Sequence, residues 1–130
     1  KFTIHSCIIE CSSDEIHIFR EYIKTRNFNP QQLIIKKQNS AIWDNRFLIS
    51  SFISDIKCLV FSDIIWFKLK NRYKFIKNSK NISYNILKTL PVLLHKNKMI
   101  IPFLTNKKIM MSMGISVIFK PKMPLTKKNF

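Results

Sequence analysis

A chain of 130 residues with a 46% hydrophobic share is long enough for one domain with a single core. Its 23 basic residues against 7 acidic ones give a formal net charge of +16, which favours a polyanionic partner such as RNA or an anionic membrane surface. Three irregularly spaced cysteines exclude a disulfide framework, and no charge-free run approaches the roughly 20 residues of a membrane-spanning helix.

The first part of the chain predicts a hairpin followed by a loop. Apolar and polar residues alternate over residues 2–10 and again over 15–22, and the polar residues 12–14 between them predict a turn. The stretch 25–32 is polar and contains Pro30, so we expect a loop there.

The next elements are a short strand and a tight turn. QLIIKK, residues 32–37, predicts a strand. In IWDNRFLIS, residues 42–50, two apolar ends surround Asp44 and Asn45. Both residue types tolerate a left-handed backbone and bond to nearby amides, so we expect them to form a tight turn between two extended segments.

The middle of the chain, residues 54–77, fits both helical spacing and, over FKLKNRYKF, strand alternation. Its length favours a helix. Ser62 and Asp63 mark a start for that helix, because both serve the free amides of a first turn and Asp63 suits its positive end.

The last part of the chain predicts a short helix and two strands. Residues 82–91 contain the helix, with Ser83 as its cap and Pro91 just past its end. Residues 98–104 and 116–125 are late strands, confined to edges or ends by their prolines. Without a regular βαβ alternation, we expect a small mixed α+β domain with an N-terminal hairpin, one or two helices in the middle and late edge strands.

Metal binding and catalysis both lack the residues they need. His5, Cys7 and Cys11 share one extended stretch and His17 lies on its partner, but two cysteines four positions apart on a strand are about 13 Å from each other. One zinc ion cannot bind both, so we expect no metal site. The chain also has no glycine-flanked serine, phosphate loop or paired-carboxylate motif, so we expect no catalytic residue.

Basic residues interleaved with aromatic ones in FKLKNRYKFIKNSK, residues 67–80, are the remaining candidate site. Lysine and arginine contact phosphates, and an exposed aromatic ring stacks on an unpaired base. The alternative is that the aromatic residues belong to the core and the lysines to a solvated face. The candidate RNA-binding residues are Lys68, Lys70, Arg72, Lys74, Lys77, Lys80, Lys107, Lys108, Lys120 and Lys122.

Five short motifs occur in order along the chain: TIHSCIIE, IFREY, IWDNRF, LKTLPVL and MIIPFL. Together they resemble the C-terminal region of bacterial tRNA(Ile)-lysidine synthetases, particularly the rickettsia-like alphaproteobacterial form. That family has a Thr-Leu-Gly-Gly-Cys strand, an Arg-Glu pair, a Trp-Asp-Gly-Arg-Phe turn, a Thr-Leu-Pro segment and a late strand ending near proline. His5, Ser6 and Asn45 stand where the family has glycine, and asparagine suits a turn that needs positive φ. The matching positions are 3–7, 20–21, 43–47, 89–91 and 100–102. The resemblance implies structural roles for Trp43, Asp44, Asn45, Arg46, Phe47 and Pro91.

The resemblance implies that residues 1–130 are the tRNA-binding accessory region of a larger cytoplasmic ligase. That enzyme uses ATP and Mg to adenylylate the wobble cytidine of tRNA(Ile), and lysine then displaces AMP to form lysidine. Its Ser-Gly-Gly-x-Asp-Ser phosphate loop belongs to an N-terminal domain and has no counterpart in this chain. The expected partners are therefore tRNA(Ile) and that catalytic domain, and we expect no cofactor in the chain itself.

Two rival interpretations stay open. The scarcity of glycine and the abundance of lysine and asparagine fit an AT-rich genome, so the charge can be genome bias on a non-catalytic scaffold domain. A basic amphipathic stretch also fits peripheral membrane attachment, although we expect no membrane partner. A homodimer is compatible with the sequence.

Overall fold

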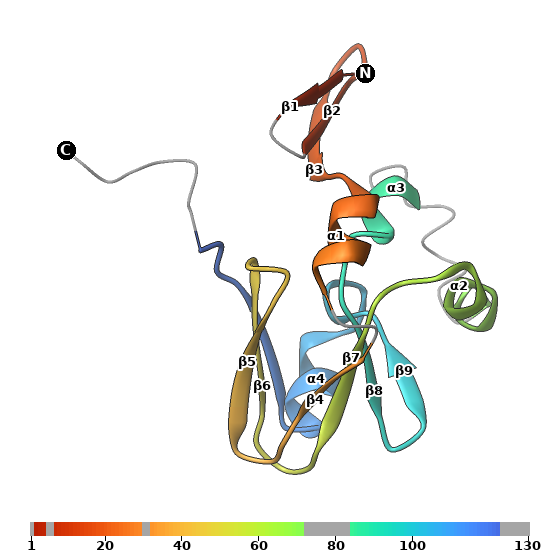
Figure 1. Cartoon of the computed structure of the whole chain (residues 1–130). Coiled ribbons are helices and arrows are strands. Elements are labelled where there is room, and N and C mark those ends of the chain that lie inside the picture. The colour runs from red at the N-terminus through yellow and green to blue at the C-terminus, as the bar shows by residue number, and fades with distance from the viewer. Residues whose placement is uncertain (1, 5–6, 30–31, 72–83, 123–130) are drawn as a thin grey trace.

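The computed structural model describes residues 2–4, 7–29, 32–71 and 84–122. Their strands form three antiparallel sheets, and short helices lie between and beside them. In Figure 1 the N-terminal sheet stands at the top, and the other two sheets form the lower body of the molecule. The mixed α+β class predicted from the sequence is confirmed.

The N-terminal sheet contains β1 (Phe2–Ile4), β2 (Cys7–Cys11) and β3 (Ile16–Arg20), in that order. The predicted hairpin turn before β3 is confirmed, with the Ser12 N–H donating to the Glu15 carbonyl at 2.9 Å. The prediction of one strand over residues 2–10 was wrong, because β1 and β2 pair antiparallel with Ile4 opposite Cys7. The sequence did not reveal the break, because apolar and polar residues alternate through both strands and no glycine or proline lies between them.

Helix α1 (Tyr22–Phe28) extends over the first half of the stretch 25–32, where a loop was expected. Tertiary contacts stabilise it: the Tyr22 hydroxyl donates to the Phe61 carbonyl at 2.9 Å, and the Asn29 side-chain amide donates to the Thr25 carbonyl at 2.8 Å. Thr25 is fully buried. The polar composition that predicted a loop was therefore misleading, because these polar side chains are satisfied inside the protein.

The second sheet has the order β10–β6–β5. Its hairpin consists of β5 (Asn39–Trp43) and β6 (Phe47–Ser51), and β10 (Ile115–Phe119) lies at its edge as predicted for a late strand. The predicted turn is confirmed, since Asp44 and Asn45 both have φ of 53° and the Arg46 N–H donates to the Trp43 carbonyl at 3.1 Å. Two successive positive φ values match the right-handed twist of the flanking strands.

The third sheet has the order β4–β7–β8–β9 and contains β4 (Gln32–Ile35), β7 (Ile56–Leu59), β8 (Val92–His95) and β9 (Lys98–Ile100). The strand predicted over residues 32–37 is confirmed as β4, and of the strand predicted over residues 98–104 only 98–100 form β9, because a 3-10 turn follows at Pro102. The stretch 54–77, which fitted both helix and strand in the sequence, begins as a strand, because β7 alternates with Ile56 and Cys58 buried and Lys57 exposed. Strand β8 was not predicted, since an almost entirely buried strand shows no alternation.

Helix α2 (Asp63–Leu69) begins where predicted, and the Ser62 hydroxyl accepts the Ile65 N–H at 3.3 Å. Helix α3 (Tyr84–Leu87) confirms the helix expected before Pro91, while its expected cap Ser83 lies outside the described residues. A 3-10 turn, η2 (Pro102–Leu104), follows β9, and helix α4 (Lys107–Ser112), which was not predicted, leads into β10.

Two groups of buried residues form the core. The larger one fills the space between the second and third sheets and α4, and the smaller one packs α2 and α3 against the third sheet. The larger group contains Ile35, Trp43, Phe47, Ile49, Ile56, Cys58, Leu93, Ile100, Met110 and Ile115. The smaller contains Phe61, Ile65, Leu69, Leu87, Val92 and Ile101.

Candidate functional site

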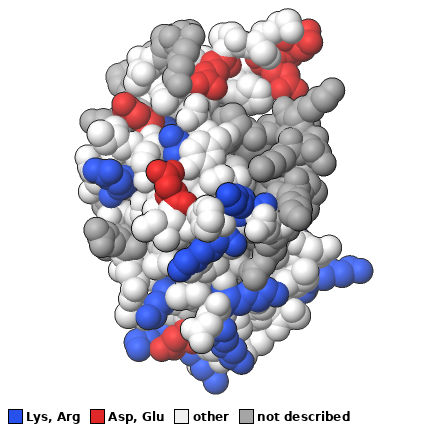
Figure 2. Space-filling model, turned by 90° about the vertical axis from the view of Figure 1, so that its right-hand side faces the viewer, with Lys and Arg blue, Asp and Glu red and all other residues white. Residues whose placement is uncertain are grey.

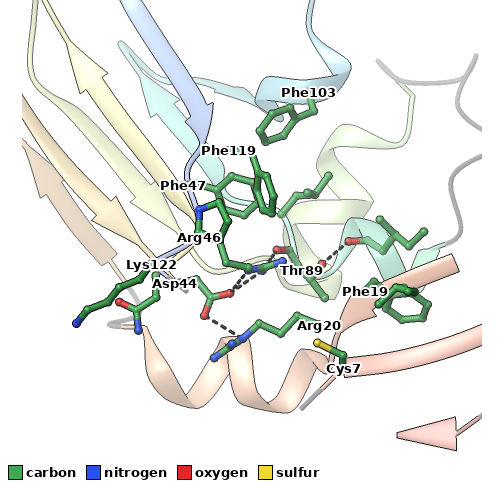
Figure 3. A pocket seen from close by; sticks show the side chains of 15 residues that line it. Cys7, Phe19, Arg20, Asp44, Arg46, Phe47, Thr89, Phe103, Phe119 and Lys122 are labelled. Carbon is green, nitrogen blue, oxygen red and sulfur yellow. Dashed lines mark hydrogen bonds and ion pairs between the residues drawn. The ribbon is translucent and has the colours of Figure 1, made fainter. Parts of the chain in front are cut away.

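The carboxylate of Asp44 is the centre of the polar contacts above the second sheet. Its side chain is 0% exposed and lies between two guanidinium groups (Figure 3). Arg46 donates from Nη2 and Nε to Asp44 Oδ2 at 2.6 and 2.7 Å, and Arg20 Nε lies 3.2 Å from Oδ1. Burial lowers the pKa of Arg46, and the Asp44 carboxylate counteracts this by stabilising the charged guanidinium.

A second layer of hydrogen bonds connects Asp44 to two helices. The Thr25 hydroxyl donates to Oδ2 at 3.3 Å, and the Asp44 N–H donates to the Asn29 side-chain oxygen at 2.8 Å. Arg46 Nη2 donates to the Thr89 carbonyl, which follows α3, at 2.7 Å. The Asp44 turn thus links β3, α1 and the end of α3.

Three of the five motifs that carry the family resemblance therefore converge on one point. Arg20, the Asp44–Arg46 turn and Thr89 come from three separate motifs, and all contact the buried carboxylate or its guanidinium partner. Trp43 and Phe47 flank the turn and are buried, as is Pro91. Nothing in the sequence alone indicated that these motifs meet.

A pocket of about 780 Å³ opens beside this centre, between the N-terminal sheet and the body (Figure 3). Phe47 forms part of its wall, with the Phe103 ring centroid at 5.3 Å and the Phe119 centroid at 5.5 Å. Arg46 lies over the Phe47 ring at 4.9 Å. The lining residues are Cys7, Ile18, Phe19, Arg20, Asp44, Asn45, Arg46, Phe47, Ile86, Thr89, Leu90, Phe103, Phe119, Pro121 and Lys122.

The structure describes six of the ten predicted RNA-binding residues and does not bring all six together. Lys68 and Lys70 belong to α2 and its end, Lys107 and Lys108 begin α4, and Lys120 and Lys122 follow β10. Figure 1 shows α2 and the end of β10 on opposite sides of the molecule. The other four, Arg72, Lys74, Lys77 and Lys80, lie outside the described residues.

The described start of the interleaved aromatic stretch, residues 67–71, is part core and part surface. Leu69 is 2% exposed and belongs to the core, whereas Phe67 is 68% exposed. The Lys70 ammonium lies 4.2 Å from the Phe67 ring centroid, so the start of this stretch presents an aromatic ring together with a cation.

A lysine cluster on the third sheet was missed by the sequence analysis. Lys36, Lys57 and Lys96 surround a hollow of about 290 Å³ together with Asp55. Asp55 Oδ2 accepts from Lys36 Nζ at 3.1 Å. These lysines come from three segments that only the pairing of β4, β7 and β8 brings together, so no local pattern could have indicated them.

No metal-ligating group is formed by the described residues: no three of their His, Cys, Asp or Glu side chains converge. His17 pairs with Glu15 at 3.0 Å, and burial raises the pKa of the Cys58 thiol. Asp44 does not fit Mg either, because two arginines already neutralise it.

Within the described ranges, no helix has the length and apolar character needed to span a membrane.

No family model and no solved structure matches the chain. Curated relatives do match. The tRNA(Ile)-lysidine synthase of Orientia tsutsugamushi (strain Boryong) is 31% identical over 134 residues, covering 93% of this chain and 28% of the relative. The synthases of Rickettsia prowazekii (strain Madrid E) and Rickettsia typhi (strain ATCC VR-144 / Wilmington) are each 31% identical over 98 residues, covering 72% of this chain and 22% of theirs.

The chain thus spans about a quarter of the length of these relatives, and the matched portion lies at their C-terminal end. This agrees with the resemblance seen in the five motifs. The chain is related to the C-terminal region of the bacterial tRNA(Ile)-lysidine synthases.

Proposed function

We propose that this chain is the C-terminal part of a tRNA(Ile)-lysidine synthase and that it binds the body of tRNA(Ile) in the cytoplasm. The observation that carries the proposal is the match of 93% of the chain to a synthase of that name. Conversion of the wobble cytidine to lysidine, with ATP and Mg, is then the work of the preceding catalytic domain. The chain's part is to hold the substrate.

The distribution of charge supports tRNA binding by the body rather than by the N-terminal sheet. Four of the seven acidic residues, against two of the 23 basic ones, fall within the first 21 positions. In Figure 2 acidic atoms gather mainly at the top, the end of the molecule where the N-terminal sheet lies, and basic atoms spread over the lower half. A polyanion is attracted to the body and repelled by the acidic end.

The exposed lysines of the body suit phosphate contact. Lys68, Lys107 and Lys108 are exposed, and so are the lysines that surround the hollow on the third sheet. Contacts of this kind position an RNA without reading its sequence, because every nucleotide carries the same phosphate. Sequence discrimination is therefore not expected from them.

Salt dependence of tRNA binding tests the proposal. We expect log K to fall linearly with log salt concentration, and the variant Lys107→Gln/Lys108→Gln to reduce the slope by roughly 0.7–0.9 for each phosphate that the variant no longer neutralises. The matched control is Lys107→Arg/Lys108→Arg, which keeps both charges and should keep the slope. Fluorescence anisotropy with labelled tRNA(Ile) provides the measurement.

The rival interpretation, a scaffold domain whose charge is genome bias, makes the opposite prediction. One expected result is that the unmodified chain shows no saturable tRNA binding. The other is that the glutamine variant binds tRNA with unchanged affinity and unchanged salt slope, at an unchanged melting temperature. Either result would overturn the tRNA-binding role.

A further inference from the structure

The pocket beside Asp44 has a surplus of positive charge. Its lining includes two arginines and Lys122, and Asp44 is its only acidic member among the described residues. One carboxylate thus faces two guanidinium groups that remain charged at neutral pH. The partly apolar surroundings strengthen this surplus relative to bulk water, so the pocket attracts an anionic group.

Aromatic rings at the same pocket are partly exposed. Phe103 is 47% exposed and Phe119 is 59% exposed, and both rings contact Phe47, which is 3% exposed. Large apolar surfaces that stay accessible next to a cavity gain free energy when a flat apolar group covers them. Cations and exposed rings together fit a ligand that has an anionic part and a flat aromatic part.

The pocket is large enough to hold one ligand of that kind. A volume of about 780 Å³ lies in the ordinary range for small-molecule sites. A paired base presents only its edge to a protein, whereas an unpaired base exposes its face for stacking on aromatic side chains. Lys122, which lines the pocket, and Lys120, which directly follows β10, are both among the basic residues predicted to contact RNA.

We propose that this pocket binds one unpaired nucleotide of the bound tRNA, with the base against Phe103 and Phe119 and a phosphate toward Lys122 and Arg46. The proposal rests on the tRNA-binding role proposed above. It adds a site that distinguishes single-stranded from double-stranded RNA, because an unpaired base enters the pocket and a paired base does not. The buried ion pairs of Asp44 hold the guanidinium groups in place at the floor of the pocket.

The test uses the full chain with Phe103→Ala and Phe119→Ala, singly and combined. Loss of one stacked base is expected to weaken binding of tRNA(Ile) and of a single-stranded 12-nucleotide RNA about 5- to 100-fold. The salt slope should stay unchanged, because both variants keep every cationic side chain. A 12-base-pair RNA duplex should bind with unaltered affinity.

Phe52→Ala is the matched control, because Phe52 is 57% exposed and does not line the pocket. It should leave every affinity as in the unmodified chain. If an alanine variant unfolds, Phe103→Leu and Phe119→Leu keep the apolar bulk while losing the aromatic face, and they should still weaken single-strand binding.

Three outcomes would overturn the pocket assignment while leaving the proposed function intact. The first is unchanged single-strand affinity in both aromatic variants, and the second is an equal loss of affinity for the duplex. The third is saturable binding of free 5′-AMP that depends on Phe103 and Phe119 while RNA binding does not. Failure of the proposed function is distinct, since the unmodified chain would then bind no tRNA in a salt-dependent way.

Discussion

At the scale of a single residue, Asp44 combines three structural properties. Its backbone has positive φ, its carboxylate is fully buried, and its oxygens lie between Arg20 and Arg46. Burying charged groups costs hydration free energy, and close pairing with good geometry offsets that cost. The family's aspartate at this point of the turn therefore has a structural reason here: it orients the elements that meet around it.

We expect Asp44→Asn to lower the free energy of unfolding by about 3–5 kcal/mol, because two buried guanidinium groups then lack their counter-charge. Urea denaturation followed by circular dichroism measures this. Asp55→Asn is the control, since Asp55 pairs with Lys36 on the surface and its removal should cost far less. Equal losses of stability in the two variants would contradict a special role for the buried carboxylate.

Asn45 shows how the turn tolerates its departure from the family pattern. Glycine is expected there from the resemblance, and asparagine adopts the required φ of 53°. Asparagine is among the residues that most often occupy this left-handed region, whereas a β-branched residue is strained there. The substitution therefore keeps the turn and places a polar side chain at the pocket.

At the scale of elements, the turn between α4 and β10 depends on Gly114. It has φ of 66°, and a Cβ built there would clash with the Ile53 side chain. Its carbonyl accepts the Phe52 N–H at 2.8 Å, which attaches the start of β10 to the loop after β6. Two separate constraints, backbone conformation and space, thus act at one position.

Gly114→Ala is expected to destabilise the protein by about 1–2 kcal/mol from the backbone strain, with a further loss of stability from the clash with Ile53. In an Ile53→Ala background the clash is relieved, so adding Gly114→Ala should cost only the stability lost to backbone strain. Thermal unfolding of the four proteins separates the two contributions. Full recovery in the double variant would show that φ carries no cost here.

At the scale of the whole molecule, His95 connects the third sheet to the loop after β6. The His95 side chain and the Ser54 hydroxyl are 2.7 Å apart, and His95 is 7% exposed. Burial, and secondarily the nearby Lys96, lowers the pKa of His95 below its ordinary value of 6.5. The folded protein therefore resists protonation of His95 more than the unfolded chain does.

Because the unfolded chain takes up this proton first, the free energy of unfolding is expected to fall as the pH drops below about 6.5. His95→Gln does not titrate, so its stability should change less between pH 7.5 and 5.5. Urea unfolding of both proteins across that range tests the expectation. Parallel pH profiles would show that His95 contributes nothing to the acid sensitivity.

The sequence by itself determined the mixed α+β class, the Asp44–Asn45 turn, the start of α2 and the late strands at sheet edges. These features depend on short-range chemistry, such as tolerance of positive φ, a serine cap and prolines that cannot donate to a sheet. The order of five weak motifs also pointed to the family that the curated relatives share.

Only the tertiary structure decided the rest. The pairing of β4, β7 and β8 brings Lys36, Lys57 and Lys96 together, and the burial of Thr25 and Asn29 makes α1 a helix in a stretch whose composition predicted a loop. The pocket beside Asp44 likewise collects residues from both ends of the chain. Such groupings arise from contacts between segments far apart in sequence, and the free energy of those contacts outweighs the local preferences that a sequence reveals.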